Sequence, residues 1–286
     1  QASAISDDGK IVIACMQDGY VSRTINAGIT WTPLERGFVF GAPTFKEGLD
    51  VSMSDDGARV FVAAVEVFVS YNGGTSFISV ALPKTDDVFV RSIASNKTGA
   101  LVLAVGAYAA GGIYAAISID AGETWAEITP QIASNISGDI LIKAAVSDSG
   151  GDIAVLSSTG FIAFSKNYGS TFNAATGNQI TDPDSVGLPI SISMSREGER
   201  LVYTTWIGAA ISALDNYSVF GKLADLNPGA PRGEVFTRAI ANNNIGWYAV
   251  HEQGFASRSV TPPQDVISCA PPSAAVPDVF TQLDLR

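Results

Sequence analysis

The sequence predicts an all-β protein, a six-bladed β-propeller with four antiparallel strands in each blade. Three observations lead to this prediction. A short polar motif with a glycine and a closing aromatic residue recurs along the chain of 286 residues. The closing aromatics lie 46, 48, 47 and 48 residues apart, a period that accommodates four short strands per repeat. Between the motifs, short apolar runs alternate with Gly-bearing turns, which is typical of closed all-β folds.

The recurring motif predicts a tight turn. It reads TINAGITW (24–31), SYNGGTSF (70–77), SIDAGETW (118–125) and SKNYGSTF (165–172), with a degenerate fifth copy, ALDNYSVF (213–220). We expect the Asp or Asn to accept backbone N–H bonds, the Gly to supply a positive φ, and the aromatic ring to be buried between sheets. This assignment favours a structural turn over a Ca²⁺ or catalytic loop. The residues in these roles are Asn26, Gly28, Trp31, Asn72, Gly74, Phe77, Asp120, Gly122, Trp125, Asn167, Gly169 and Phe172.

The strands of each repeat follow from the runs around these motifs. First strands end in turns such as AISDDG (4–9), SMSDDG (52–57), VSDSGG (146–151) and SMSREG (193–198). Second strands include RVFVAAV (59–65) and RLVYTTW (200–206), third strands VFVSY (67–71) and GFIAFS (160–165), and fourth strands TWTPL (30–34) and TWAEI (124–128). In the last repeat, GFASRS (254–259) is the predicted third strand and VFTQL (279–283) the fourth, with a Pro-rich insertion at 261–278 between them. The blades are then about 1–36, 49–82, 89–130, 140–176, 189–224 and 235–286, in a single domain over 1–286.

Composition excludes several classes of partner. The net charge of −11 disfavours nucleic-acid binding and adsorption to anionic membranes, because both need a basic surface. The uncharged run Ala100–Ile119 has the length of a membrane span. However, Gly111 and Gly112 interrupt it, no Lys/Arg cluster flanks it, and the repeat continues through it as two strands. We therefore expect no membrane span.

The turn motif resembles the Asp-box, or bacterial neuraminidase repeat, whose pattern is S-x-D-x-G-x-T-W. Relatives in that family include six-bladed sialidases, sortilin-type receptors, xyloglucanases and photosystem assembly factors. The resemblance implies that each motif links a third to a fourth strand, on the side away from the ligand face. It bears on the fold far more than on activity, because one fold hosts many functions.

The resemblance also implies where ligands would bind, on loops that join fourth to first strands and second to third strands. Near the axis, the first strands carry Asp50, Arg91, Lys143, Ser191 and Thr237, with Arg238 adjacent. Three of these, Arg91, Lys143 and Arg238, would bind a carboxylate, sulfate or phosphate. The alternative is that they pair with nearby acids, namely Asp50, Asp86, Asp87, Asp139 and Glu234.

Aromatic side chains form a second candidate site on the same loops. Phe38, Phe40 and Phe45, together with Tyr108 and Trp206, are predicted there. Aromatic rings stack on sugars, anchor protein interfaces or fill gaps between blades, and all three roles stay open.

Catalytic machinery is not evident. A sialidase-type site needs an arginine triad, a Tyr nucleophile with its Glu, and an Asp acid/base, and the family's Arg-Ile-Pro motif does not occur. The acids Asp18, Glu66 and Glu252 lie in predicted loops and are interpreted as a solvated rim. His251 is the only histidine, so zinc clusters are not predicted, and we expect neither metal nor cofactor.

Cysteines, sequons and the start of the sequence point to secretion. Cys15 lies in the first repeat and Cys269 in the last, which are neighbours in a closed ring, so we predict a disulfide, with two free thiols as the alternative. Asn96, Asn135 and Asn216 lie in glycosylation sequons in predicted turns or loops. The sequence begins at Gln1 without a signal segment, as a mature secreted protein does, although a trimmed chain would look the same.

The sequence thus predicts a non-catalytic extracellular binding or assembly module, with a glycan or protein partner at a cell surface and a capacity for self-assembly. A mean hydropathy of +0.23 and only 16% charged residues favour the assembly role. Two alternatives remain, a glycoside hydrolase of sialidase-like fold and a photosystem-assembly-type propeller.

Overall fold

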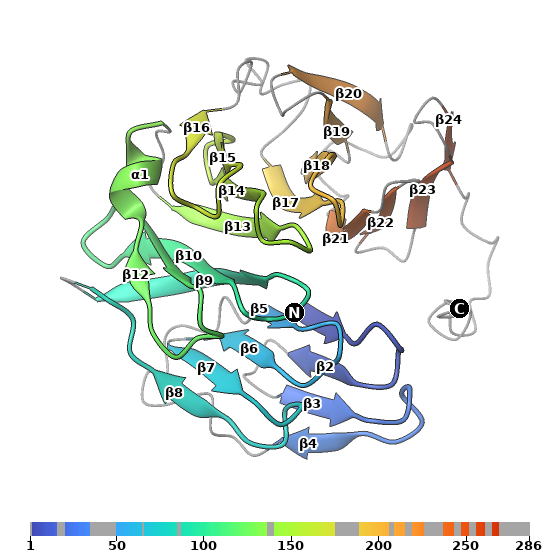
Figure 1. Ribbon diagram of the computed structural model, residues 1–286. Helices are drawn as coiled ribbons and strands as arrows, with labels where there is room; N and C mark the ends of the chain where they lie inside the picture. The colour runs from blue at the N-terminus through green and yellow to red at the C-terminus, as the bar shows by residue number, and fades with distance from the viewer. Residues whose placement is uncertain are drawn as a thin grey trace. The chain divides into compact units, whose positions relative to one another are not determined.

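The computed structural model in Figure 1 describes most of the first two thirds of the chain and separate strands beyond it. Contacts between Cα atoms divide the chain into two compact units, Gln1–Asn178 and Gln179–Arg286, and each is considered by itself. Side chains are described as far as residue 202. The described residues are 2–15, 21–34, 50–64, 66–84, 87–135, 140–174, 189–205, 209–214, 219–225, 237–242, 247–251, 256–260 and 265–268.

The first unit contains four sheets, each made of four antiparallel strands in chain order. The first sheet is β1 (Ala2–Ile5), β2 (Val12–Cys15), β3 (Val21–Thr24) and β4 (Thr32–Leu34). The second is β5 (Asp50–Met53), β6 (Val60–Ala63), β7 (Val67–Ser70) and β8 (Ile78–Val80). The third is β9 (Val88–Ser95), β10 (Val102–Tyr108), β11 (Ile113–Ser118) and β12 (Ala126–Glu127). The fourth is β13 (Leu141–Val146), β14 (Ile153–Ser157), β15 (Ile162–Ser165) and β16 (Asn173–Ala174).

The second unit contains two further sheets of the same kind. The fifth sheet is β17 (Pro189–Met194), β18 (Leu201–Thr205), β19 (Ala209–Leu214) and β20 (Val219–Asp225). The sixth is β21 (Thr237–Asn242), β22 (Trp247–His251), β23 (Ala256–Val260) and β24 (Asp265–Ser268). The prediction of an all-β chain built from sheets of four antiparallel strands is confirmed, and this arrangement is consistent with a β-propeller.

Two elements differ from the sequence prediction. The fourth strand of the sixth sheet, β24, lies inside the stretch 261–278 that we assigned to an insertion, because Asp265–Ser268 continues the pairing of β23. The predicted strand 279–283 lies outside the described residues. A short helix, α1 (Thr129–Ala133), follows β12, where Pro130 starts the turn and the buried Ile132 packs against the sheets.

The uncharged run Ala100–Ile119 forms two paired strands, β10 and β11, as predicted. Gly111 and Gly112 make the turn between them, both with positive φ. In the part of the chain that the structure describes, no helix is long and apolar enough to cross a membrane.

Apolar side chains fill the spaces between successive sheets of the first unit. Each fully buried aliphatic side chain of this kind stabilises the fold by about 1.5–3 kcal/mol. Ile13, Val21 and Val60 lie between the first and second sheets; Phe61, Val69 and Val102 between the second and third; and Leu103, Ile117 and Ile153 between the third and fourth.

Candidate functional site

The four repeated motifs form turns with one hydrogen-bond pattern, and we call Thr24–Trp31, Ser70–Phe77, Ser118–Trp125 and Ser165–Phe172 the box turns. In the third one, the Ser118 hydroxyl donates to Asp120 Oδ1 over 2.7 Å and accepts the Gly122 N–H over 2.8 Å. Asp120 Oδ1 in turn accepts the N–H of Thr124 over 2.8 Å. The predicted role of the Asp or Asn as a backbone acceptor is therefore observed. The role of the first Ser or Thr, which is buried and links both ends of the turn, was not deduced from the sequence.

Each box turn needs two consecutive residues with positive φ. The glycines have φ between 77° and 87°, as predicted. The residue before each glycine also has positive φ: Ala27 at 56°, Gly73 at 64°, Ala121 at 62° and Tyr168 at 59°. Its N–H donates to the turn between the first two strands of the same sheet, as Ala121 does to the Ala100 carbonyl over 2.8 Å. This bond ties the two turns at that end of the sheet and compensates for an unfavourable conformation.

The glycine of a box turn also lets the turn approach the preceding sheet. A Cβ on Gly74 would lie 2.7 Å from Cδ1 of Ile13 in the first sheet. A Cβ on Gly122 would lie 3.0 Å from Cγ2 of Val69, and a Cβ on Gly169 would lie 2.9 Å from Cδ1 of Ile117. A Cβ on Gly28, in contrast, would meet only its own turn's Trp31, at 3.9 Å. Three box turns are thus packed between sheets, and the first has no such neighbour among the described residues.

The closing aromatic residues also differ between the first box turn and the other three. Phe172 is 5% exposed and lies between the third and fourth sheets, while Phe77 and Trp125 are partly buried against the preceding sheet. Trp31 is 46% exposed, so the prediction that its ring is buried is wrong for the first box turn. No sheet of the first unit precedes it.

Of the predicted cationic site on the first strands, the structure joins Asp50 and Lys143. Lys143 Nζ lies 3.0 Å from Asp50 Oδ2, although the two residues belong to the second and fourth sheets. The same oxygen accepts the Ser92 hydroxyl over 2.6 Å and the Ile93 N–H over 3.2 Å, from the sheet between them. Asp50 is only 7% exposed. This cluster matches the alternative in which the cations pair with nearby acids, because Lys143 is held by a buried carboxylate.

Arg91 does not occupy the position we assigned to it, because Ser92 is the residue of the third sheet that matches Asp50 and Lys143. Ser92 pairs with Val105 and Val90 with Gly106, so Arg91 is the extra residue between them. Ser92 lies four residues before the turn residue Asn96, as Asp50 and Lys143 do before Ser54 and Ser147, and Arg91 lies one residue further back, in a β-bulge. The fourth, fifth and sixth sheets have a register shift at the same place, which in the sixth falls at Arg238, whose side chain lies outside the described residues.

Among the predicted aromatics, Tyr108 is the one that the structure describes. Its hydroxyl donates to Glu127, and its ring packs edge-on against Tyr114 with centroids 5.2 Å apart. These contacts match the packing alternative for Tyr108. Phe38, Phe40, Phe45 and Trp206 lie outside the described residues, as do Asp18, Asp86, Asp139, Glu234 and Glu252.

The other predicted site residues have mixed outcomes. Cys15 is buried, and its burial, with the nearby charge of Asp50, raises the pKa of the thiol to about 12. Cys269 and Asn216 lie outside the described residues, so the disulfide and the third sequon stay predictions.

Asn96 lies in a turn as expected, but it is buried and its Oδ1 accepts the Leu101 N–H over 3.1 Å, so the folded chain does not offer it for glycosylation. Asn135 follows α1 and its Nδ2 donates to the Gln131 carbonyl over 2.9 Å.

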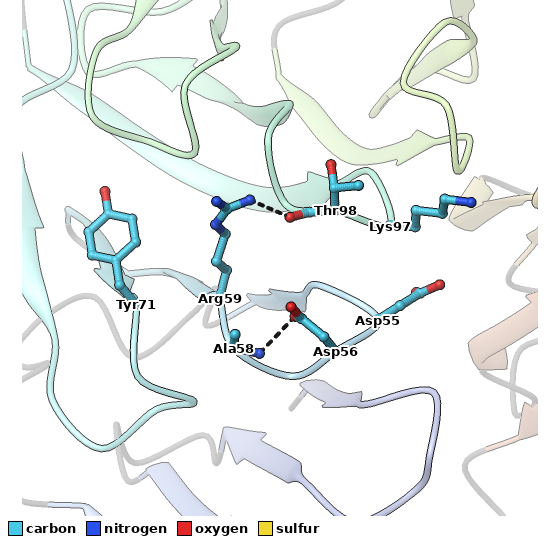
Figure 2. Close-up of a pocket in the computed structure, with 7 residues that line it drawn as sticks. All are labelled: Asp55, Asp56, Ala58, Arg59, Tyr71, Lys97 and Thr98. Atoms are coloured by element: carbon cyan, nitrogen blue, oxygen red, sulfur yellow. Dashed lines mark hydrogen bonds between the residues drawn. The ribbon is translucent and has the colours of Figure 1, made fainter.

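A depression of about 600 Å³ lies elsewhere, at the end of the sheets where the box turns are. It is formed by the second and third sheets and is lined by Asp55, Asp56, Ala58, Arg59, Tyr71, Lys97 and Thr98, as Figure 2 shows. By the resemblance, this end is opposite to the expected ligand face. The sequence analysis did not find this depression, and the position of Arg59 gives no clear signal, because the equivalent turns have Ile11, Leu101, Asp152 and Arg200 there.

The lining of the depression is fixed by hydrogen bonds. The N–H of Asp55 donates to the Lys97 carbonyl over 2.7 Å, which joins the second sheet to the third. Arg59 Nη1 donates to the Thr98 carbonyl over 2.6 Å, and the Tyr71 hydroxyl donates to the Ala121 carbonyl over 3.2 Å. The Ser54 hydroxyl and the Ala58 N–H bind Asp56 and keep the pKa of its carboxyl below the usual range. The site therefore presents fixed charges of both signs. In the described part of the chain, no cluster of three His, Cys, Asp or Glu side chains is suited to hold a metal ion.

Comparisons with solved structures support the fold. The chain is similar to "YCF48 bound to D1 peptide", with a TM-score of 0.62 and 16% identity over 93% of this chain and 80% of that one. That structure is a β-propeller, as are the two structures that follow. YCF48 from Cyanidioschyzon merolae gives a TM-score of 0.62 at 14% identity, over 94% of this chain and 84% of that one. A GH74 xyloglucanase from Xanthomonas campestris gives 0.67 at 14% identity, over 94% of this chain but 45% of that one.

No protein-family model matches the chain, and no curated protein is similar to it. At identities of 14–16%, the likeness to solved structures extends to the fold and not to activity.

Proposed function

We propose that this chain is a non-catalytic β-propeller that binds a protein or glycan partner in an extracellular setting, at a cell surface or in a matrix. In this proposal the six sheets are the blades of one propeller domain of the Asp-box family. The family assignment is supported by the hydrogen-bond pattern that all four box turns share, which a chance similarity of sequence would not produce.

The state of the acidic side chains carries the non-catalytic part of the proposal. Hydrolysis by a carboxylate pair needs one carboxyl that stays protonated near neutral pH, which requires a raised pKa. Among the described carboxyls with a shifted pKa, Asp8, Asp56 and Asp120, every shift is downward. Each of these accepts hydrogen bonds inside its own turn. Asp50 binds Lys143 and Ser92, and Glu66 accepts the hydroxyl of Ser79.

A protein is the favoured partner class. The solved structures with this fold include one titled as YCF48 bound to a D1 peptide and one titled as a nidogen/laminin complex. The depression described above also has acidic and basic side chains, which can pair with basic and acidic residues of a polypeptide. Binding of partners by this chain is inferred from these two observations together.

The test uses the purified full chain on arrays of glycans and of short synthetic peptides, beside a panel of fluorogenic glycosides and xyloglucan. We expect retention of peptides or glycans and no release of sugar. Hydrolysis that disappears in Glu66→Gln or Asp50→Asn would contradict the proposal and favour a hydrolase, the function to which the xyloglucanase likeness points.

A role in photosystem assembly is the second candidate, and the likeness to two YCF48 structures favours it to a comparable extent. The two candidates place the protein in different compartments. Immunolocalisation of the native protein outside the cell would support the extracellular role, and its recovery in a thylakoid lumen would replace it with the assembly role.

A further inference from the structure

We propose that the depression between the second and third sheets binds a carboxylate of a polypeptide partner, with Arg59 and Lys97 as its cationic contacts. This inference rests on the proposed function as a binding module and assigns the binding site to residues. The proposed ligand is an acidic side chain or a chain end with apolar and basic residues beside it.

Arg59 is held in place by the backbone of the neighbouring sheet, and its charge contributes to the lowered pKa of Asp56. One nitrogen of its guanidinium donates to the Thr98 carbonyl, as Figure 2 shows, and its aliphatic part lies against Gly99. A guanidinium has five N–H donors, so further donors remain for a ligand. Within the described residues Arg59 forms no ion pair. An arginine whose side chain is already positioned loses less entropy on binding an anion.

Lys97 adds a second cation from the neighbouring sheet. It is exposed in the turn that links β9 to β10, and it too forms no ion pair within the described residues. The other lysines whose side chains are described, Lys10, Lys84, Lys143 and Lys166, lie 3.0–3.4 Å from a carboxylate oxygen. Lys97 thus differs from the other described lysines, and it lines the same depression as Arg59.

The aspartates of the depression select a single carboxylate over a phosphate or sulfate. Asp55 and Asp56 balance the charges of Arg59 and Lys97, and Asp56 stays ionised because its pKa is lowered. A dianion would be repelled by these two carboxylates, whereas one carboxylate binds the cations and a neighbouring basic group of the ligand faces the aspartates. Adjacent acidic and basic groups are common in polypeptides.

Tyr71 adds an aromatic surface to the depression. It is 43% exposed, and its hydroxyl donates to the Ala121 carbonyl. An apolar residue beside the acid of a peptide would cover this ring. The oligosaccharides in the experiment below test the alternative that a sugar stacks on it.

The experiment measures binding of amidated synthetic peptides, each with one Asp or Glu between apolar and basic residues, and of oligosaccharides containing uronic acid. Fluorescence polarisation is recorded for wild type, for Arg59→Gln/Lys97→Gln, for Lys97→Gln alone, and for Lys10→Gln as matched control. Lys10 lies in the equivalent turn of the first sheet, where it is paired with Asp8. Thermal melts check that the variants fold.

We expect acidic peptides to bind wild type and Lys10→Gln equally. The double variant should lose about ten- to hundredfold in affinity and Lys97→Gln less, because hydrogen bonds to charged groups are among the stronger ones. Unchanged peptide binding in the folded double variant would overturn this site and leave the proposed function standing. Failure of wild type to bind both the peptides and the oligosaccharides would overturn both, and loss confined to uronic acids would replace the polypeptide with a glycan.

Discussion

The box turn of the first sheet and the box turns of the next three sheets have the same hydrogen bonds and different neighbours. In all four, a hydroxyl joins the Asp or Asn to the glycine N–H over 2.7–3.0 Å. Gly74, Gly122 and Gly169 are packed against a preceding sheet, and within the described part of the first unit Gly28 is not. The comparison shows that the motif has two separable functions, one inside the turn and one between sheets.

The closing aromatics should show the largest difference. Phe172→Ala removes a ring buried between two sheets and should lower the free energy of unfolding by about 3–5 kcal/mol. Trp31→Ala should cost less than about half of that, because the residue is already 46% exposed. Urea unfolding of both variants checks this. Equal losses would mean that Trp31 is as well covered as Phe172.

The glycines should show the next largest difference. Gly28→Ala carries only the cost of a left-handed residue, about 1–2 kcal/mol. Gly74→Ala adds an overlap with Ile13, for which overpacking typically costs a further ~1–3 kcal/mol. Chemical denaturation measures both losses. The idea of a between-sheet function fails if the two glycines prove interchangeable with alanine at the same cost.

The hydroxyls should show no difference between the two classes of turn. Thr24 and Ser70 are equally buried and make the same bonds within their turns. Thr24→Val and Ser70→Ala should therefore each cost about 1–3 kcal/mol, the price of leaving buried partners unsatisfied. A much smaller loss for Thr24→Val would show that the turn itself depends on the covering sheet.

The smallest effect is on the pH dependence of stability. It distinguishes the third box turn, which has an Asp, from the other three, which have an Asn. The hydroxyl and N–H of Thr124, with the Ser118 hydroxyl, lower the pKa of Asp120 to about 2. A depressed folded-state pKa gives stability that is present above the unfolded pKa and is lost as the pH falls through the folded one. Asp120→Asn should therefore be nearly silent at pH 7 and should flatten the loss of stability between about pH 4 and pH 2. Melting temperatures of both proteins across this range test it, and a large loss at pH 7 would contradict it.

The sequence predicted the geometry of the turns, but it did not predict the contacts that depend on neighbouring sheets. The glycine φ values and the Asp/Asn acceptors follow from local chemistry, so repeated letters predicted them. The bulge at Arg91 leaves no clear mark in the sequence, but the position equivalent to Asp50 was readable from it, because Ser92 and not Arg91 lies four residues before the turn residue Asn96. The contact between Gly74 and Ile13 joins residues of different repeats, which no single repeat shows. Arg59 gave no such signal, because its position in the repeat varies between apolar and charged residues, namely Ile11, Leu101, Asp152 and Arg200.

Amide hydrogen exchange of the intact chain, read by mass spectrometry, tests the comparison most directly. The glycine N–H bonds of the second, third and fourth box turns are buried, and that of Gly28 is partly buried. We predict that the first box turn exchanges faster than the other three by at least about tenfold, since within the first unit its opening does not require two sheets to separate. Equal protection of all four box turns would contradict this account and would show that a sheet from outside the first unit covers the first box turn, as in a closed ring.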